Sequence, residues 1–349
     1  MLSSGAAHNG CSCSSCSSTC SQRGCNTDRC PHPPADQTYT VDQLGLFQHI
    51  SSQANKFLMM EEAKARNMVQ LLISNALALP YLMDELLAMA ALHLSSLSSD
   101  LVEKLGYQRQ ASLLHNRAIS LYDMGSTADA GGDSMGKFLF YSLRSLQNLL
   151  EISECEHDSS RCLHRLVDFL HFHQKMRAHK DRALQVLRTT SLQPLIQSIA
   201  DVDPDAAISR GGRACDELSA RIETAGLDPA AMESCRVAIK HLRWVFGVQE
   251  TFPAEFGGKA HVVMAWPLLI PEHFVDLLDQ RRPEALAIVA HYAALLYSCN
   301  DLWVFGDRGK CLVQSISGYL QPYWREWLSW PNIIVNAVGW TDSCDDRLV

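Results

Sequence analysis

Apolar residues recur at helical spacing through almost the whole chain after residue 39. Four of them at four-residue steps show the pattern most clearly: Leu82, Leu86, Ala90 and Leu94. This spacing puts one broad apolar face on a helix of about four turns, and Pro80 stands where a proline suits the start of a helix. Alternating runs of β-branched residues, which are typical of strands, are nearly absent. The sequence therefore predicts an all-α fold.

Turn-forming residue pairs divide this body into separate helices. The pairs are Gly131-Gly132, Asp203-Pro204, Gly211-Gly212, Asp228-Pro229 and Gly257-Gly258. Besides the helix that begins at Pro80, we expect helices over residues 41–59, 62–77, 100–123, 134–152, 160–188, 205–224, 229–249, 283–299 and 308–320. No internal repeat of fixed period is visible. We therefore expect one multi-helix domain over residues 39–349.

The composition is that of an ordinary globular protein, with 47% hydrophobic and 19% charged residues. The formal net charge of -8 argues against nonspecific affinity for nucleic acid, because phosphate contacts need clustered Lys and Arg. No uninterrupted apolar stretch approaches the length of a membrane span, and no secretory signal is visible at the N-terminus. We therefore expect an intracellular protein whose cysteines are thiols or metal ligands.

Six of the thirteen cysteines are crowded near the N-terminus: Cys11, Cys13, Cys16, Cys20, Cys25 and Cys30. A binuclear zinc cluster needs two C-x2-C pairs, and here only Cys13 and Cys16 form one. Arg23 and Arg29 alone supply positive charge within this run, too little for a DNA-binding module. We expect residues 1–38 to be a disordered Cys/Ser-rich tail that ends in a Pro-rich linker. Zinc binding by the six thiolates is the alternative.

Two further motifs fall short of a catalytic site. Residues 131–137 match G-x-x-x-x-G-K, but Phe138 stands where a phosphate-binding loop has a hydroxyl, so a glycine hinge before a helix is the better interpretation. His164, Asp168 and His171 share one helical face and could hold a metal, although histidines on a wet helix face are commoner. No nucleophile–base or paired-carboxylate pattern stands out. We expect a protein that is not an enzyme.

Three tryptophans lie at three-residue steps near the end of the helical body: Trp324, Trp327 and Trp330. On a single helix that ends at Pro331 they would share roughly one side. Aromatic residues arranged in this way more often cover a core than bind a ligand, because large rings bury much apolar surface. We therefore expect them to pack against the core.

Several segments resemble a known family when taken in order. They read VDQLGLFQHIS at 41–51, MDELLAMAALHLS at 83–95 followed by YQRQASLLHNRAISLY at 107–122, and ALAIVAHYAALLYSCNDLWVFGDRGKCLVQSISGYLQPYWREWLSWP at 285–331. Together they resemble the regulatory body of fungal zinc-cluster transcription factors, in the branch similar to sterol uptake control proteins. The family's characteristic positions are occupied by His49, Leu87–Leu94, Ala290–Ala293, Trp303, Trp327, Trp330 and Pro331. Residues 176–195 also resemble the family's middle helix, so the resemblance covers roughly residues 40–331.

The resemblance implies a fungal transcriptional regulator that is nuclear when active. It implies control of one pathway, such as a secondary-metabolite gene cluster or sterol and lipid metabolism. The helical body would bind a lipid or other small-molecule effector, and partners would be other transcription regulators or a second copy of the chain. DNA binding does not carry over, because the cysteine spacing departs from the family's zinc cluster, which was lost or is encoded upstream. The alternative is a cytoplasmic helical ligand-binding or scaffold protein.

Overall fold

The computed structural model describes residues 39–126, 134–152, 158–190, 192–193, 197, 203–210, 212–251, 258–320 and 322–337. Within these ranges the chain is all-α and contains no strand, as the sequence predicts. The described residues from Thr40 onward belong to one compact unit. The six N-terminal cysteines lie outside the described residues, as do four of the turn glycines, Gly131, Gly132, Gly211 and Gly257. The tail and its zinc alternative therefore stay predictions.

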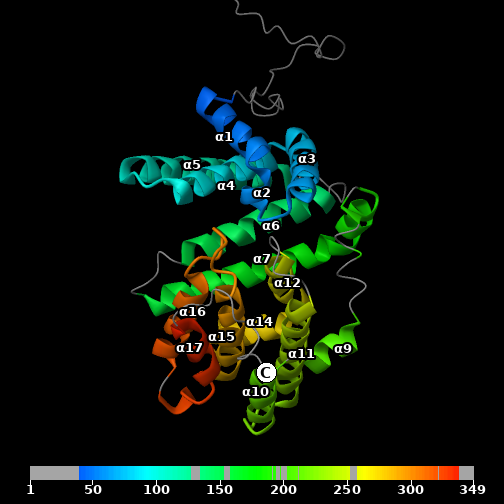
Figure 1. Cartoon of the computed structure of the whole chain (residues 1–349), viewed down its shortest axis with the longest axis vertical. Coiled ribbons are helices and arrows are strands. Elements are labelled where there is room, and N and C mark those ends of the chain that lie inside the picture. The colour runs from blue at the N-terminus through cyan, green and yellow to red at the C-terminus, as the bar shows by residue number, and fades with distance from the viewer. Residues whose placement is uncertain are drawn as a thin grey trace, which may run out of the picture. The chain divides into compact units, whose positions relative to one another are not determined.

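The N-terminal part consists of helices packed around α4, and Figure 1 shows them in blue and cyan. They are α1 (Val41–Ser52), α2 (Ala54–Leu58), α3 (Glu62–Ala78), α4 (Pro80–Leu97) and α5 (Leu101–Ser126). Helix α4 pairs with α5 along most of its length and also contacts α1 and α3. Leu82, Leu86 and Ala90 are fully buried, so the apolar face predicted for this segment forms the centre of this part.

Two acidic side chains lie within this buried surface. Asp84 and Glu85 on α4 are fully buried, which is costly for carboxylates unless they are paired. Asp84 accepts two hydrogen bonds from the Arg117 guanidinium, at 2.5 and 2.6 Å, and Glu85 Oε2 lies 2.8 Å from His115 Nδ1. Both partners lie on α5. These polar contacts fix how α4 and α5 align, because apolar packing alone is not directional.

The middle of the fold is formed by α6 (Ser134–Glu151) and α7 (Ser159–Arg188). Helix α6 packs on α4 and along α7, and α7 in turn contacts α13, α14 and α16 (Figure 1). Arg177 on α7 donates to the carbonyl of Leu268 at 2.9 and 3.0 Å and also to the carbonyl of Ile270. Helix α7 therefore joins the N-terminal helices to the C-terminal ones.

The C-terminal part is a group of helices around α15. They are α9 (Pro204–Arg210), α10 (Arg213–Glu223), α11 (Pro229–Thr251), α12 (Gly258–Val263), α13 (Trp266–Leu269), α14 (Glu272–Asp279), α15 (Pro283–Tyr297), α16 (Arg308–Tyr319), the 3-10 turn η3 (Pro322–Trp324) and α17 (Ser329–Asn336). Residues 284–296 of α15 are buried without a break. Its Tyr292 ring stacks on Trp266 with centroids 4.5 Å apart. Helix α15 is therefore the core helix of this part.

The structure corrects two predicted helices and adds three that the sequence did not predict. The single helix expected over 41–59 divides at Gln53, and α2 ends at Met59 in a left-handed conformation (φ 54°). The segment 205–224 forms two helices, since α9 ends at Arg210 and α10 begins at Arg213. The sequence between them has two glycines, which disfavour helix. Helices α12, α13 and α14 were not predicted, since each has at most eight residues and little periodicity to detect.

The tryptophan-rich end is also arranged differently from the prediction. Trp324 belongs to η3, Trp330 to α17, and Trp327 to the turn between them, so the three do not share one helix. Pro331 does not end a helix but lies in the first turn of α17, where no backbone N–H is needed. All three rings pack against the core, as expected. Among the described helices, none is both long and apolar enough to cross a bilayer.

Candidate functional site

Three of the segments that carry the family resemblance meet at one aromatic cluster. We define the His93 cluster as His49 from α1, Phe57 from α2, His93 from α4, and Trp303 from the turn after α15. The ring centroid of His93 lies 5.0 Å from that of His49, 5.7 Å from Phe57 and 4.8 Å from Trp303. Residues more than 200 positions apart in sequence thus enclose one imidazole, which no local pattern predicts.

Hydrogen bonds fix the members of the His93 cluster. His49 Nε2 and His93 Nδ1 are 2.9 Å apart, so one ring donates and the other accepts. Trp303 Nε1 donates to the Phe57 carbonyl at 3.0 Å. Burial, followed by the charges of His49 and Lys56, lowers the pKa of His93 to about 4, and burial also lowers the pKa of His49. Both imidazoles are therefore neutral near pH 7, and the N–H of one ring bonds to the bare nitrogen of the other.

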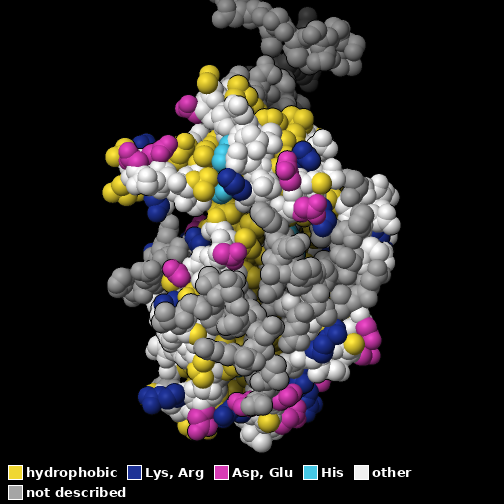
Figure 2. Space-filling view, viewed as in Figure 1, with side chains coloured by type: hydrophobic (Ala, Val, Ile, Leu, Met, Phe, Trp, Pro, Cys, Tyr) yellow, Lys and Arg dark blue, Asp and Glu magenta, His cyan; other side chains and the backbone are white. Residues whose placement is uncertain are grey.

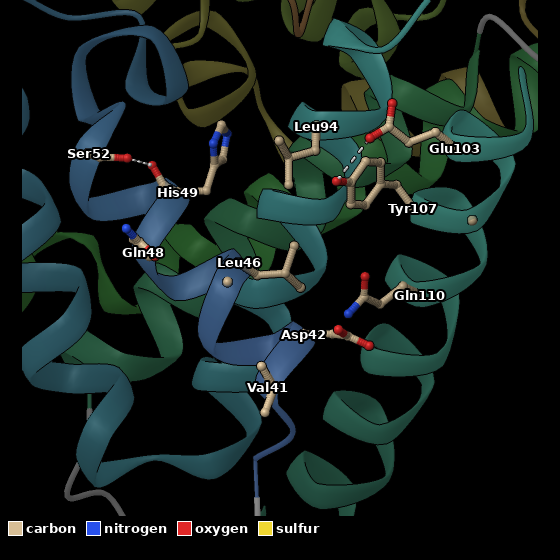
Figure 3. Close-up of a pocket in the computed structure, with 12 residues that line it drawn as sticks. Val41, Asp42, Leu46, Gln48, His49, Ser52, Leu94, Glu103, Tyr107 and Gln110 are labelled. Carbon is tan, nitrogen blue, oxygen red and sulfur yellow. Dashed lines mark hydrogen bonds between the residues drawn. The ribbon is translucent and has the colours of Figure 1, made fainter. Parts of the chain in front are cut away.

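A surface groove of about 670 Å³ opens beside His49, between α1, the end of α4 and the start of α5 (Figure 3). Apolar and acidic side chains line it together, among them Val41, Leu46, Leu94, Asp42 and Glu103. The lining contains no Lys or Arg, so the groove has acidic character.

Two glycines and one tyrosine shape this groove. A Cβ added to Gly45 or Gly106 would meet nothing within 4 Å, so both helices present bare backbone to the groove. The Tyr107 hydroxyl donates to Glu103 Oε1 at 3.5 Å, as Figure 3 shows. Burial, and then the neighbouring Glu103 carboxylate, raises the pKa of Tyr107. The groove offers hydrogen-bonding groups but no nucleophile–base pair.

Exposed apolar side chains gather near the same end of the molecule. They lie at the tip of the α4–α5 hairpin and on the outer side of α1: Val41, Leu44, Leu97, Leu101, Val102 and Leu105. Val102 is 79% exposed and Val41 83%. Figure 2 shows apolar side chains over this region, interspersed with charged ones. A patch of this kind is typical of a protein–protein contact surface.

The resembling segment 285–331 also makes a contact within itself, in the C-terminal core. His291 on α15 stacks on Trp330 with ring centroids 5.4 Å apart and planes 8° apart, and the Phe246 ring meets Trp330 edge-on at 5.3 Å. His291 is buried, and its Nδ1 lies 2.9 Å from the Ala287 carbonyl oxygen, to which it donates. Burial lowers the pKa of His291 to about 4. These contacts are structural, since both rings cover the core.

The structure does not gather the histidines of α7 into a metal site. His164 Nε2 lies 3.7 Å from Asp168 Oδ2, whereas His171 turns to Asp279 on α14 at 2.9 Å. His173 is buried and bonds to the Phe169 carbonyl. Across the part of the chain that the structure describes, no three His, Cys, Asp or Glu side chains converge as metal ligands. His164 is exposed and His171 partly so, in keeping with the preferred interpretation of a wet helix face.

Other residues singled out in the sequence have structural surroundings. Lys137 lies in the first turn of α6, which begins at Ser134, so the G-x-x-x-x-G-K match runs into a helix. Cys215 and Cys235 are buried, and burial raises the pKa of each thiol to about 12. Such thiols are unreactive. Sequence reasoning missed Phe57, because tertiary packing alone brings it to the site.

Comparison with known proteins gives a partial similarity. No family model matches the chain, and no solved structure matches it. A curated protein of Gibberella zeae, described as a Zn(2)-C6 fungal-type transcription factor, is 26% identical over 150 residues, which is 39% of this chain. The aligned stretch spans 28% of that protein's length, well under two thirds. The chain is thus similar to one part of a fungal zinc-cluster transcription factor.

Proposed function

We propose that this protein is a fungal transcriptional regulator that acts through its helical body and is not an enzyme. The observation that carries the proposal is the similarity to the Gibberella zeae transcription factor. The structure supports it, because three of the resembling segments meet around His93, and one of them packs on itself where His291 stacks on Trp330. The described residues also offer no nucleophile–base arrangement in the groove beside His49.

The finer parts of the proposal concern place and partners. The protein would be nuclear when active and would control one pathway, either a secondary-metabolite gene cluster or sterol and lipid metabolism. The cysteine spacing and sparse positive charge of residues 1–38 favour recruitment through another regulator or a second copy over direct DNA binding. The apolar tip of the α4–α5 hairpin supports such a contact, because several large apolar side chains exposed close together are typical of protein–protein interaction sites.

The test is a tethering experiment with the full chain. Fused to an unrelated DNA-binding domain, the protein should change transcription of a matching reporter several-fold in either direction. The unrelated domain alone is the control. No change in the reporter, together with strictly cytoplasmic fluorescence of the tagged protein under inducing conditions, would contradict the proposal and favour the scaffold alternative.

A second experiment separates recruitment from direct DNA binding. Chromatin immunoprecipitation of the full chain is compared with a variant that lacks residues 1–38. Retention of the signal supports recruitment through a partner, whereas loss of the signal assigns DNA binding to the cysteine-rich segment. A variant with all six of its cysteines changed to serine shows whether the thiolates are responsible for such a loss.

A further inference from the structure

A second cavity, of about 450 Å³, lies where α4, α5, α6, α7 and α16 come together. It is separate from the groove beside His49 and shares no lining residue with it. Its volume is that of a site for a small molecule. Five helices from both parts of the fold contribute to its walls, so its shape depends on the assembled protein.

The charged groups of this cavity are mostly cationic. Lys104, Arg165 and Arg308 line it, against the single carboxylate of Glu151, which is three positive charges to one negative. Arg165 lies 2.9 Å from Glu151 and 3.8 Å from Asp168, which stands outside the lining. The excess positive charge remains when Asp168 is counted, although the whole chain carries a net charge of -8. The cavity is therefore suited to an anion.

The cations differ in how firmly they are held. Arg308 Nε donates to the Leu150 carbonyl at 3.2 Å, and its Nη1 donates to the carbonyls of Trp303 and Phe305 at 3.3 and 3.4 Å. This guanidinium is therefore fixed in place before any ligand arrives. Lys104 is exposed at the rim, where its flexible side chain can close on a ligand.

The neutral polar groups of the cavity are mainly acceptors. Ser95, Ser96 and Ser112 each donate their hydroxyl hydrogen to a backbone carbonyl, at 3.3, 2.7 and 3.0 Å. Their oxygen lone pairs remain available to accept. Gln147 is 7% exposed, and its Oε1 has no hydrogen-bond partner among the described residues. A buried carbonyl oxygen of this kind needs a donor, and none of the described residues provides one.

We propose that this cavity binds a small hydroxylated organic anion, of the class of phosphate esters of polyols or hydroxy acids. The anionic group would face Arg308 and Lys104, and ligand hydroxyls would donate to the serine oxygens and, once the Gln147 side chain turns toward the ligand, to Gln147 Oε1. A sterol or fatty acyl chain does not suit it, because most of the lining is polar. The inference stands apart from the proposed function, since it concerns binding and not transcription.

The test measures binding of two probes to the purified full chain by calorimetry and thermal unfolding at constant ionic strength. The probes are glycerol 3-phosphate and citrate, with glycerol and potassium chloride as controls. At least one of the two anions should bind and raise the melting temperature, and glycerol should not. Binding of glycerol 3-phosphate alone assigns a phosphate ester, and binding of citrate alone assigns a hydroxy acid.

Two variants locate the site. Lys104→Met and Gln147→Leu should each weaken binding at least tenfold, whereas Arg109→Met, an exposed cation of α5 outside the lining, should leave it unchanged. Gln147→Leu removes an unpaired buried carbonyl, so its unliganded melting temperature should not fall, and lost binding cannot then be ascribed to misfolding. The proposal is wrong if neither anion binds, or if both variants bind as tightly as the wild type. Failure of the reporter experiment leaves this result unaffected.

Discussion

At the scale of single residues, the buried histidines are the most informative. His93, His173 and His291 lie in different helices, and each is at most 3% exposed. Burial lowers the pKa of each of them to about 4, because a charged imidazole loses its hydration inside the protein. His173 and His291 donate to the carbonyl four residues earlier in their own helices, and His93 is bonded to His49. All three are therefore neutral in the folded protein at neutral pH.

These histidines predict a loss of stability in mild acid. In the unfolded chain an imidazole has a pKa of about 6.5, so between that value and about 4 the unfolded state binds more protons. The free energy of unfolding should therefore fall as the pH drops through this window, by up to about 1.4 kcal/mol per pH unit for each histidine. Urea unfolding at pH 7.5, 6.0 and 5.0 measures this fall in the free energy of unfolding.

A matched pair of variants on α7 assigns the effect. His173→Asn removes a buried imidazole and should make the pH dependence of the free energy of unfolding shallower. His164→Gln changes an exposed ring on the same helix and should leave that dependence as in the wild type. The interpretation fails if both variants keep the wild-type pH dependence or if the wild type is equally stable at pH 7.5 and 5.0.

At the scale of elements, glycines set the closest helix contacts. A Cβ on Gly247 of α11 would collide with the backbone of Ala207 in α9, and a Cβ on Gly309 of α16 would collide with the backbones of Ala293 and Tyr297 in α15. These helix pairs therefore approach more closely than any side chain would allow. The glycines of the groove, Gly45 and Gly106, face open space instead.

This difference predicts opposite effects of the same substitution. Gly309→Ala should destabilise the protein by about 1–3 kcal/mol or more, because backbone atoms of α15 must shift to admit the methyl group. Gly106→Ala should stabilise it by up to about 1 kcal/mol through helix propensity alone. Urea unfolding followed by circular dichroism compares the two. Equal effects of the two substitutions would show that α15 and α16 are not in close backbone contact.

Elements also show what the sequence could and could not predict. Helix α4 was predicted because its apolar residues keep a regular four-residue step from Leu82 to Leu94. The division of the expected helix 41–59 at Gln53 was not predicted, because neither Gly nor Pro occurs there. Helix α13 has only four residues, too few for a periodic signal, and includes Pro267. Periodicity identifies long helices and fails for short ones.

The candidate sites were less predictable than the helices. His49 and Trp303 were singled out through the family resemblance, but their meeting around His93 depends on contacts across the whole fold. Gln147 gave no signal, since a glutamine on an amphipathic helix is usually exposed. Which polar residue becomes buried is decided by packing between helices, and a single sequence does not record that packing.

At the scale of the whole molecule, the hydrogen bond from Trp303 to the Phe57 carbonyl joins the first helices to the C-terminal part. Trp303→Phe keeps an aromatic ring but removes the donor, at a cost of about 1 kcal/mol. Amide hydrogens of α1 and α2 should then exchange about fivefold faster, while those of α11 should be unchanged. Hydrogen exchange measured by mass spectrometry reports each helix separately.

The matched control for this prediction is Trp324→Phe, which changes a partly buried ring that packs on Trp327, with centroids 4.9 Å apart, away from the His93 cluster. It should leave exchange in α1 and α2 as in the wild type. Faster exchange throughout the protein in Trp303→Phe would mean that this hydrogen bond stabilises the fold as a whole and not the attachment of the first helices.

The separation of 246 positions between Phe57 and Trp303 also determines the order in which the cluster's residues are synthesised. Ribosomes add about 5–20 residues per second, so roughly 12 to 50 s pass between the synthesis of Phe57 and that of Trp303. For the greater part of that interval, from the synthesis of His93 onward, every nascent copy of the chain has made His49, Phe57 and His93 but not the indole that covers them. The first helices are therefore synthesised early, but their aromatic surface is covered only after Trp303 has been made. Chaperones have that time to bind the uncovered surface.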